Sequence, residues 1–118
     1  MEKQKTVLIV DDEPGIRTVV RFIIEDAGFQ TKEAASADEA LQILYADGIN
    51  VVLTDVEMPG SKNGLDLARL IRSKWQHVKV ILMSGRTLPR RNELPDETQV
   101  LTKPFSPDRL MFVIQEAL

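Results

Sequence analysis

The sequence predicts an α/β protein in which helices cover both faces of a parallel sheet. Two observations support this prediction. Short apolar runs alternate along the 118 residues with segments whose apolar residues recur at helical spacing, and such alternation is typical of βαβ units with right-handed crossovers. The apolar runs also differ in polarity, because some are continuously apolar and others are mixed. Continuously apolar strands are typical of the centre of a parallel sheet.

The size and composition of the chain predict one soluble domain. We expect residues 1–118 to form it, with a cytoplasmic location, because 43% hydrophobic and 28% charged residues are ordinary values for a globular domain. The absence of cysteine excludes disulfide scaffolds and thiolate metal sites. A formal net charge of -3 provides no basic footprint for direct contact with nucleic acid. No segment has the length of a membrane span, and the N-terminus lacks the apolar region of a signal peptide.

The first strand is predicted at Val7–Val10 and leads into acids and a proline, which together favour a helix start. The apolar face of the helix that follows is expected to contain Ile16, Val19, Val20, Ile23, Ile24 and Ala27. A polar strand, Gln30–Ala34, comes next. Ser36 and Glu39 form a capping-box pattern that opens a second helix with Ala40, Leu41 and Leu44 on its apolar face.

The run Val51–Asp55 predicts a strand buried on both faces that ends on a carboxylate. A turn-rich loop and a third helix follow, the helix with apolar residues Leu67, Ala68, Ile71 and Trp75. The fourth strand, Val80–Met83, runs into Ser84 and Gly85.

The segment from Arg86 to Gln99 contains two prolines and few apolar residues. We predict a short, mobile helix there, starting at Pro89 and ending before Pro95. A weaker strand, Val100–Thr102, ends at Lys103 and Pro104. The last helix begins with a cap, a proline and an acid, and its apolar face comprises Leu110, Val113, Ile114, Ala117 and Leu118.

The polarity of each strand predicts its place in the sheet. The first, third and fourth are continuously apolar and are expected at the centre, whereas the second and fifth are more polar and are expected at the edges. This arrangement is the 2-1-3-4-5 order of the flavodoxin-like fold, a (βα)5 three-layer sandwich.

The predicted strands bring polar side chains to one edge of the sheet, where open α/β sheets bind ligands: Asp11, Asp12, Asp55, Ser84 and Lys103. Carboxylates at adjacent strand ends repel one another unless a cation lies between them, and Mg2+ prefers oxygen ligands. Helix capping alone would explain the first acids, but it does not require the acid on the neighbouring strand.

The lysine and the serine suggest phosphoryl chemistry at this edge. An ammonium and a hydroxyl could hold two oxygens of a phosphoryl group while Mg2+ holds a third, since phosphoryl transfer needs mainly positioning and charge neutralisation. A surface ion pair for Lys103 and a turn role for Ser84 are the simpler interpretations. The carboxylate of Asp55 could bind only the cation, or it could attack phosphorus to form an acyl phosphate.

Four motifs in order resemble the receiver domain of two-component response regulators over essentially the whole chain: Val7–Glu13, Thr54–Pro59, Met83–Gly85 and Thr102–Phe105. The resemblance implies that Asp55 is the phosphoacceptor. It implies that Asp11, Asp12, Asp55 and the backbone carbonyl of Glu57 bind Mg2+. Ser84 and Lys103 would sense the phosphoryl group, and the bond between Lys103 and Pro104 is often cis in this family.

The implied function is a signalling switch rather than an enzyme. The only chemistry expected is self-phosphotransfer and autodephosphorylation of Asp55. The phosphodonor would be a histidine kinase or a phosphotransfer protein, and the output partner would be a downstream effector or a weak homodimer. The resemblance fits both a stand-alone regulator and the receiver of a larger regulator or hybrid kinase.

Three features depart from the family pattern or extend it. Val100 stands where receivers usually place an aromatic switch residue, and the loop from Gly60 to Gly64 is about one residue longer than its commonest version. The opposite charges of Glu57 and Arg86 suggest an ion pair over the phosphoryl site.

Three other functions are alternatives to the signalling switch. A phosphorylation-independent pseudo-receiver remains an alternative, although the site residues are present. An aspartate-based phosphatase needs a second acid two residues after the nucleophile on the first strand, whereas the candidate nucleophile here lies on the third. A flavin or nucleotide binder is disfavoured, because no glycine-rich phosphate loop follows the first strand and only 5% of residues are aromatic.

Overall fold

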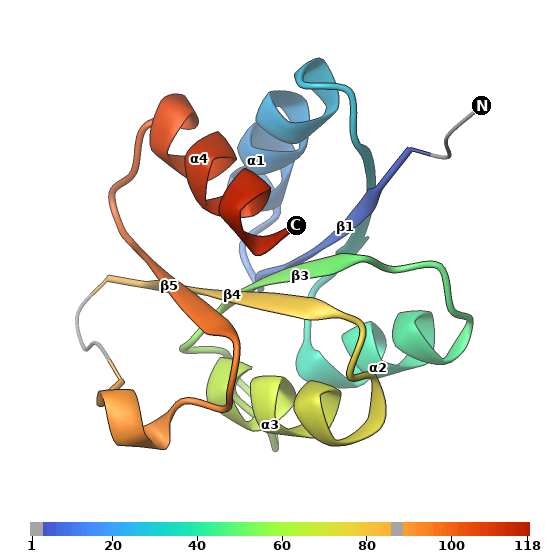
Figure 1. Cartoon of the computed structure of the whole chain (residues 1–118), viewed down its shortest axis with the longest axis vertical. Coiled ribbons are helices and arrows are strands. Elements are labelled where there is room, and N and C mark those ends of the chain that lie inside the picture. Colours follow the sequence, from blue (N-terminus) through green and yellow to red (C-terminus); the bar gives the residue numbers. More distant parts are fainter. Residues whose placement is uncertain (1–3, 86–88) are drawn as a thin grey trace.

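The computed structural model describes residues 4–85 and 89–118. Within them, strands and helices alternate along the chain (Figure 1). The strands are β1 (Thr6–Val10), β2 (Gln30–Ala34), β3 (Val51–Asp55), β4 (Lys79–Ser84) and β5 (Thr98–Thr102). The helices are α1 (Pro14–Asp26), α2 (Ala37–Tyr45), α3 (Gly64–Lys74), the 3-10 turn η1 (Arg91–Glu93) and α4 (Pro107–Ala117).

The strands form one parallel sheet in the order β2-β1-β3-β4-β5, as the polarity of the strands predicted. The register aligns the strand ends that carry the candidate site residues. Val10 of β1 pairs with Thr54 of β3, and Asp55 pairs with Met83 of β4. The residues that follow these pairs therefore reach the same edge of the sheet.

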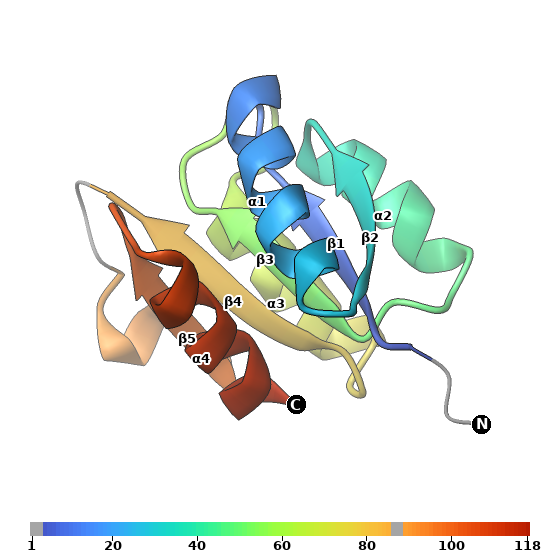
Figure 2. The ribbon, with the colours of Figure 1, turned by 90° about the horizontal axis from the view of Figure 1, so that it is seen from above.

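Two hydrophobic cores lie on opposite faces of the sheet. One joins the sheet to α2 and α3, and the other joins it to α1 and α4. Figure 2 shows α1 and α4 on the same face of the sheet. The alternating residues of β1 and β3 point to the two cores in turn. Leu8 and Val52 lie in the first core, and Ile9 and Leu53 lie in the second. Both faces are covered, which explains why these strands are continuously apolar.

The helix starts follow the predicted capping chemistry. The side chains of Ser36 and Ser106 accept hydrogen bonds from the backbone N–H groups of Glu39 and Arg109, which satisfies donors in the first turns of α2 and α4. The start of α3 carries a full capping box that the sequence analysis did not identify: Asn63 accepts from the N–H of Asp66, and Asp66 accepts from the N–H of Asn63.

The predicted apolar face of α1 was partly wrong. Val20 and Ile24 are buried, but the Val19 side chain is 59% exposed and Ala27 is also exposed. Ala27 is the C-cap residue and lies beyond the last helical turn. Val19 is the neighbour of the buried Val20 in the sequence, and its side chain is therefore rotated around the helix axis to the border of the face that packs on the sheet. Leu118, expected on the apolar face of α4, is likewise 49% exposed.

The crossover between β4 and β5 contains only the 3-10 turn η1 among its described residues. It is short and ends before Pro95, as predicted, but it begins at Arg91, two residues after the predicted start at Pro89. None of the three residues of η1 is buried. The strand β5 begins at Thr98, two residues earlier than predicted. Across the described ranges, no helix is long and apolar enough to cross a membrane.

Candidate functional site

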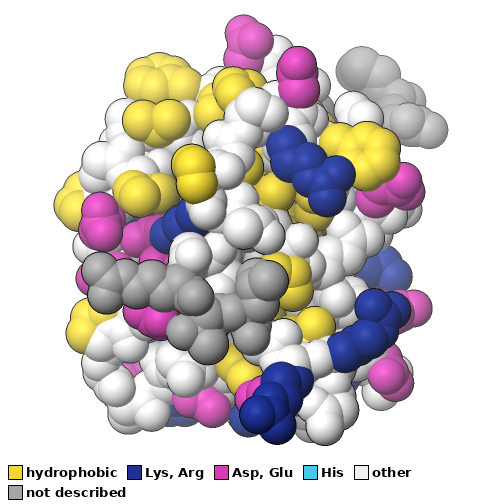
Figure 3. Space-filling model, turned by 90° about the vertical axis from the view of Figure 1, so that its left-hand side faces the viewer, with side chains coloured by type: hydrophobic (Ala, Val, Ile, Leu, Met, Phe, Trp, Pro, Cys, Tyr) yellow, Lys and Arg dark blue, Asp and Glu magenta, His cyan; other side chains and the backbone are white. Residues whose placement is uncertain are grey.

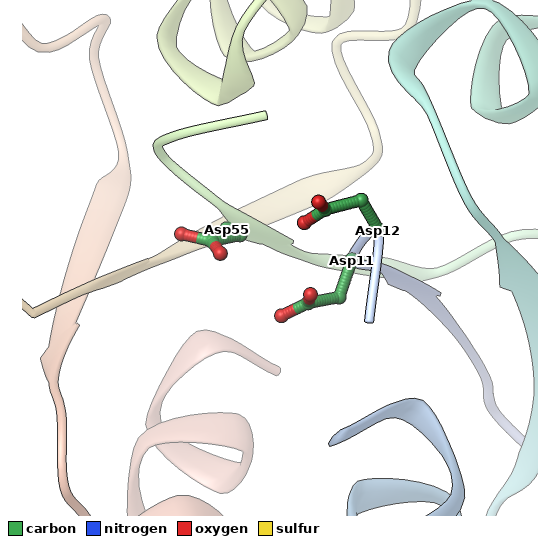
Figure 4. Close-up of side chains that lie close together, drawn as sticks. All are labelled: Asp11, Asp12 and Asp55. Atoms are coloured by element: carbon green, nitrogen blue, oxygen red, sulfur yellow. The ribbon is translucent and has the colours of Figure 1, made fainter. Parts of the chain in front are cut away.

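Three carboxylates meet where β1 and β3 end. Asp11 and Asp12 directly follow β1, and Asp55 is the last residue of β3. One carboxylate oxygen from each residue lies within 4.8 Å of the others (Figure 4). Neighbouring parallel strands ending at one edge produce this cluster, so the convergence predicted from the sequence is confirmed.

Asp11 is fully buried, and its polar atoms are unequally satisfied. Its Oδ1 accepts a hydrogen bond of 2.9 Å from the N–H of Glu13. Its Oδ2 has no hydrogen-bond partner among the described residues, although the ammonium of Lys103 is 3.7 Å away. Burial raises the pKa of the Asp11 carboxyl, and the neighbouring charges of Asp55 and Asp12 add to the increase, while the Glu13 hydrogen bond and Lys103 oppose it.

Lys103 lies across from the carboxylates at the end of β5. Its Nζ is 3.1 Å from Oδ2 of Asp55, and its side chain is about a quarter exposed. The peptide bond between Lys103 and Pro104 is cis, as the family resemblance implied. The backbone N–H of Lys103 donates to the carbonyl of Ser84, which fixes the end of β5 against the end of β4.

Ser84 and Glu57 complete the set of predicted site residues. Ser84 is buried at the end of β4, and Glu57 follows Asp55, whose Oδ1 accepts a hydrogen bond of 3.2 Å from the Glu57 N–H. A pocket of about 320 Å³ is lined by residues from all four strand ends: Asp12, Glu13, Asp55, Val56, Glu57, Ser84, Gly85 and Lys103. The predicted ion pair between Glu57 and Arg86 lies outside the described residues.

The acidic cluster fits a hard divalent cation. Its donor atoms are carboxylate oxygens, which Mg2+ prefers, and a buried carboxylate oxygen that lacks a hydrogen bond is costly without a positive partner. The single ammonium of Lys103 is shared between Asp55 and Asp11. A cation among the carboxylates would satisfy the free Asp11 oxygen and reduce the mutual repulsion of the acids.

Gly64 is a site neighbour that the sequence analysis missed. It is the first residue of α3, and its N–H donates to the carbonyl of Val56 at 2.8 Å. A Cβ at Gly64 would overlap the carbonyl oxygen of Asp55 and would lie 2.9 Å from the Cα of Val56. The start of α3 therefore packs directly on the backbone that carries Asp55. The chain pattern marked Gly64 only as a turn residue.

An apolar groove of about 890 Å³ lies beside the pocket. Glu13, Gly85 and Lys103 line both the groove and the pocket. The apolar walls come from α1 and from the segment between β5 and α4, and they include Ile16, Val19, Ile23, Pro104 and Phe105. On the face shown in Figure 3, apolar side chains gather directly above a group of acidic ones.

The family described as "Response regulator receiver domain" matches residues 7–115 of the chain. Among curated proteins, the nitrogen assimilation regulatory protein NtrX of Azorhizobium caulinodans is 34% identical over 123 residues, covering 95% of this chain and 26% of that protein. The hydrogenase transcriptional regulatory protein HoxA of Cupriavidus necator is 32% identical over 122 residues, covering 99% of this chain and 25% of that protein. The chain thus spans about a quarter of the length of these relatives.

Solved structures share the fold at similar identity. The chemotaxis response regulator CheY4 of Vibrio cholerae is 30% identical with a TM-score of 0.88, covering 98% of this chain and 100% of that chain. The response regulator protein TrrA of Thermotoga maritima, solved in complex with Mg(2+)-BeF, is 32% identical with a TM-score of 0.82, with the same coverage of 98% and 100%.

Proposed function

The chain belongs to the response regulator receiver family, and on this basis we propose that Asp55 is the phosphoacceptor of a two-component phosphorelay. The observation that carries the proposal is the surroundings of Asp55. Its carboxylate ends a central strand, contacts the Lys103 ammonium at 3.1 Å and clusters with Asp11, a buried acid whose Oδ2 accepts no hydrogen bond from the described residues. Few other roles would require a cation, an ammonium and a hydroxyl around one carboxylate.

The proposed reaction is a nucleophilic displacement at phosphorus. A carboxylate oxygen of Asp55 attacks the phosphorus of a phosphohistidine or a small acyl phosphate. The bond from phosphorus to the donor breaks, its electron pair leaves with the donor, and an acyl phosphate forms on Asp55. Water later cleaves the acyl phosphate, which returns the domain to its resting state. The domain would act on itself only and would turn over no separate substrate.

Asp11, Asp12, Asp55 and the backbone carbonyl of Glu57 would hold the Mg2+ ion in this proposal. When bound, Mg2+ would neutralise charge on the transferring phosphoryl oxygens. The description of the similar TrrA structure as a complex with Mg(2+)-BeF supports the same ion for this chain. Asp11 would contribute its free Oδ2, while its Oδ1 stays with the N–H of Glu13.

Ser84 and Lys103 would sense the phosphoryl group. An aspartyl phosphate carries a charge of about −1.5 to −2 in place of the single negative charge of the Asp55 carboxylate, and the ammonium and hydroxyl on the two neighbouring strand ends would move toward it. Because the Lys103 N–H donates to the Ser84 carbonyl, movement at one strand end is transmitted to the other. The conformational change would reach β5 through Val100 without the rotamer change of an aromatic side chain.

The partners follow from the family and from the surface beside the pocket. A histidine kinase or a phosphotransfer protein would bring its phosphohistidine to Asp55 while an apolar part of the donor occupies the groove beside α1. Residues 1–118 would act as the receiver domain, and the greater length of NtrX and HoxA supports an output region elsewhere in a longer protein. A downstream effector or a weak homodimer would receive the signal.

The deciding experiment is the intact mass of the chain after incubation with acetyl phosphate. We expect a gain of one phosphoryl group that requires Mg2+ and that Asp55→Asn abolishes. Asp26→Asn removes an exposed acid at the end of α1 and serves as the matched control, which should accept the group normally. A gain that persists in Asp55→Asn would contradict the proposed acceptor.

The same experiment distinguishes the alternatives. If neither acetyl phosphate nor a phosphorylated histidine kinase labels the wild-type chain, the pseudo-receiver interpretation replaces the phosphoacceptor. If the chain instead releases phosphate from many equivalents of donor at a steady high rate, an aspartate-based phosphatase is the better description.

A further inference from the structure

Arg17 links the end of β1 to the neighbouring strand β2. Its Nη1 donates a hydrogen bond of 2.6 Å to the backbone carbonyl of Asp11, and its Nε donates to Oε1 of Glu33 at 3.1 Å. The Arg17 side chain is only 17% exposed. One guanidinium thus joins α1, the backbone of Asp11 directly after β1, and a carboxylate on the edge strand β2.

Asp11 is consequently held at three of its four polar groups. Its N–H donates to the carbonyl of Ala34 at 3.1 Å, its carbonyl accepts from Arg17, and its Oδ1 accepts from the N–H of Glu13. Only Oδ2 is without a hydrogen bond among the described residues, and it lies 3.7 Å from the Lys103 ammonium, which also contacts Asp55. The backbone restraints leave this carboxylate little freedom to turn away from its neighbours.

Glu33 in turn fixes the Arg17 guanidinium. Its Oε1 accepts from Arg17, and its Oε2 accepts from Nη1 of Arg21 at 2.9 Å. Hydrogen bonds between a guanidinium and a carboxylate are charge-assisted and directional, because the planar group presents its donors in a fixed geometry. The Arg17 donor that reaches the Asp11 carbonyl is therefore itself held in place.

We propose that Arg17 is a positioning residue for the cation site: by holding the Asp11 carbonyl, it keeps the Asp11 carboxylate in the cluster with Asp12 and Asp55. This inference rests on the proposed function of the site. Arg17 contacts neither the cation nor the phosphoryl group and acts through Asp11. Groups that orient metal-binding side chains typically change metal affinity by about 10–100-fold when they are removed.

Arg21 provides a matched comparison on the same helix. It forms a similar ion pair with the same carboxylate, and its guanidinium lies over the Phe22 ring. Within the described part of the chain, no hydrogen bond joins Arg21 to Asp11. A purely structural role for the ion pairs of Glu33 predicts similar effects of removing either arginine, whereas a positioning role predicts that only Arg17 matters for the cation.

The test is calorimetric titration of the unphosphorylated chain with MgCl2 for the wild type, Arg17→Gln and Arg21→Gln, with unfolding by urea measured in parallel. We expect Arg17→Gln to weaken Mg2+ binding by about tenfold or more and Arg21→Gln to change it by less than about twofold. The conservative variant Arg17→Lys retains the charge but has a single donor nitrogen, so its Mg2+ affinity should fall between those of the wild type and Arg17→Gln.

A second readout separates positioning from chemistry. In phosphorylation by acetyl phosphate, Arg17→Gln should raise the Mg2+ concentration for half-maximal rate while the rate at saturating Mg2+ stays near that of the wild type. Equal Mg2+ affinities in Arg17→Gln and the wild type, or equal losses in both arginine variants, would overturn the inference. Should Arg17→Gln fail to fold, the same comparison is made between Arg17→Lys and Arg21→Lys.

Failure of the inference is distinguishable from failure of the proposed function. A wild-type chain that gains no phosphoryl group refutes the phosphoacceptor role itself. A wild-type chain that is phosphorylated with Mg2+, together with an Arg17→Gln chain of unchanged Mg2+ affinity, refutes only the positioning role.

Discussion

At the scale of single residues, Asp11 of the acidic cluster is expected to lower the stability of the fold while it serves the proposed cation site. Asp11 is a fully buried carboxyl with a raised pKa and one oxygen that no described residue satisfies by a hydrogen bond. An unsatisfied buried polar group costs about 1–3 kcal/mol, and more when it is charged. In the absence of Mg2+, this residue is expected to make the fold less stable than a neutral side chain would.

The first prediction concerns Asp11→Asn. In chelator at pH 7, the free energy of unfolding of the variant should be higher than that of the wild type by about 1 kcal/mol or more. The reason is that the amide keeps the hydrogen bond from the Glu13 N–H and can donate to neighbouring carboxylates. Urea unfolding measures this. A hundredfold excess of Mg2+ over its Kd should stabilise the wild type by about 2.7 kcal/mol and leave the variant unchanged. A variant less stable than the wild type in chelator would contradict the argument.

The pH dependence of this difference has a definite sign. Because burial raises the Asp11 pKa above its ordinary value of 3.8, the folded chain binds this proton more tightly than the unfolded chain does. The contribution of protonated Asp11 to stability is full below the ordinary value and is lost as the pH rises through the raised pKa. The stability gap between variant and wild type should therefore shrink as the pH falls from 7 toward 4, as measured by urea unfolding in chelator.

Gly64 carries the second residue-scale prediction. Gly64→Ala should displace the backbone of Asp55 and Val56. The free energy of unfolding should fall by about 1–3 kcal/mol, as for other overpacked contacts. The rate of phosphorylation at saturating Mg2+ should also fall. The control is Gly15→Ala in α1, where a Cβ meets no atom within 4 Å and where alanine favours the helix by up to about 1 kcal/mol. Normal phosphorylation of Gly64→Ala would show that the contact relaxes without moving Asp55.

At the scale of elements, the crossover between β4 and β5 differs from the others. Three crossovers carry α-helices of 9 to 13 residues, each with buried residues, whereas the described part of the fourth carries the three-residue turn η1 with none. In the described residues of this crossover, the backbone N–H groups of Glu93 and Leu94 donate to the carbonyls of Arg90 and Arg91. Leu94 packs against the core beside α2 and α3 as a partly buried side chain.

The prediction at this scale is fast amide hydrogen exchange across η1. Segments with few buried contacts open at low free energy, so the amides of Arg91 to Leu94 should exchange much faster than those of α4. The helix α4 is capped by Ser106 and buries Leu110, Val113 and Ile114. Exchange in η1 as slow as in α4, measured by NMR or mass spectrometry, would show that this crossover is as ordered as a packed helix.

At the scale of the whole molecule, the site and the apolar groove form one continuous surface. Glu13, Gly85 and Lys103 line both, so a donor protein seated in the groove would be adjacent to Asp55. In the proposed function, small phosphodonors would need only the pocket, whereas a protein donor would need the groove as well. This difference allows the chemistry and the docking to be tested separately.

The corresponding prediction is that Val19→Glu slows phosphoryl transfer from a histidine kinase by about tenfold or more, since burying an unpaired charge in an apolar contact costs at least about 1.4 kcal/mol. Labelling by acetyl phosphate should be unchanged. Thr18→Glu places the same charge at an exposed neighbour on α1 that does not line the groove and should transfer normally. Equal rates for both variants with the kinase would indicate that the donor docks elsewhere.

Much of the fold was predictable because its signals are local. Apolar runs, helical spacing and caps such as Ser106 depend on residues close together in the chain, and the polarity of each strand reports its place in the sheet. Val19 was assigned incorrectly for the same reason. Spacing describes a helical stripe but not where its border meets the sheet, and Val19 lies on the groove side of that border.

The sequence by itself determined the strand order and the residues that reach the site, because the carboxyl ends of parallel strands meet at one edge of the sheet. Asp55 and Ser84 end a strand, and Asp11 and Lys103 directly follow one. Only the tertiary structure decided how these residues are held. The overlap that a side chain at Gly64 would make with Asp55 and the hydrogen bond from Arg17 to Asp11 depend on how helices cross the sheet. Crossing geometry is set by the packing of whole faces, which no local pattern of residues specifies.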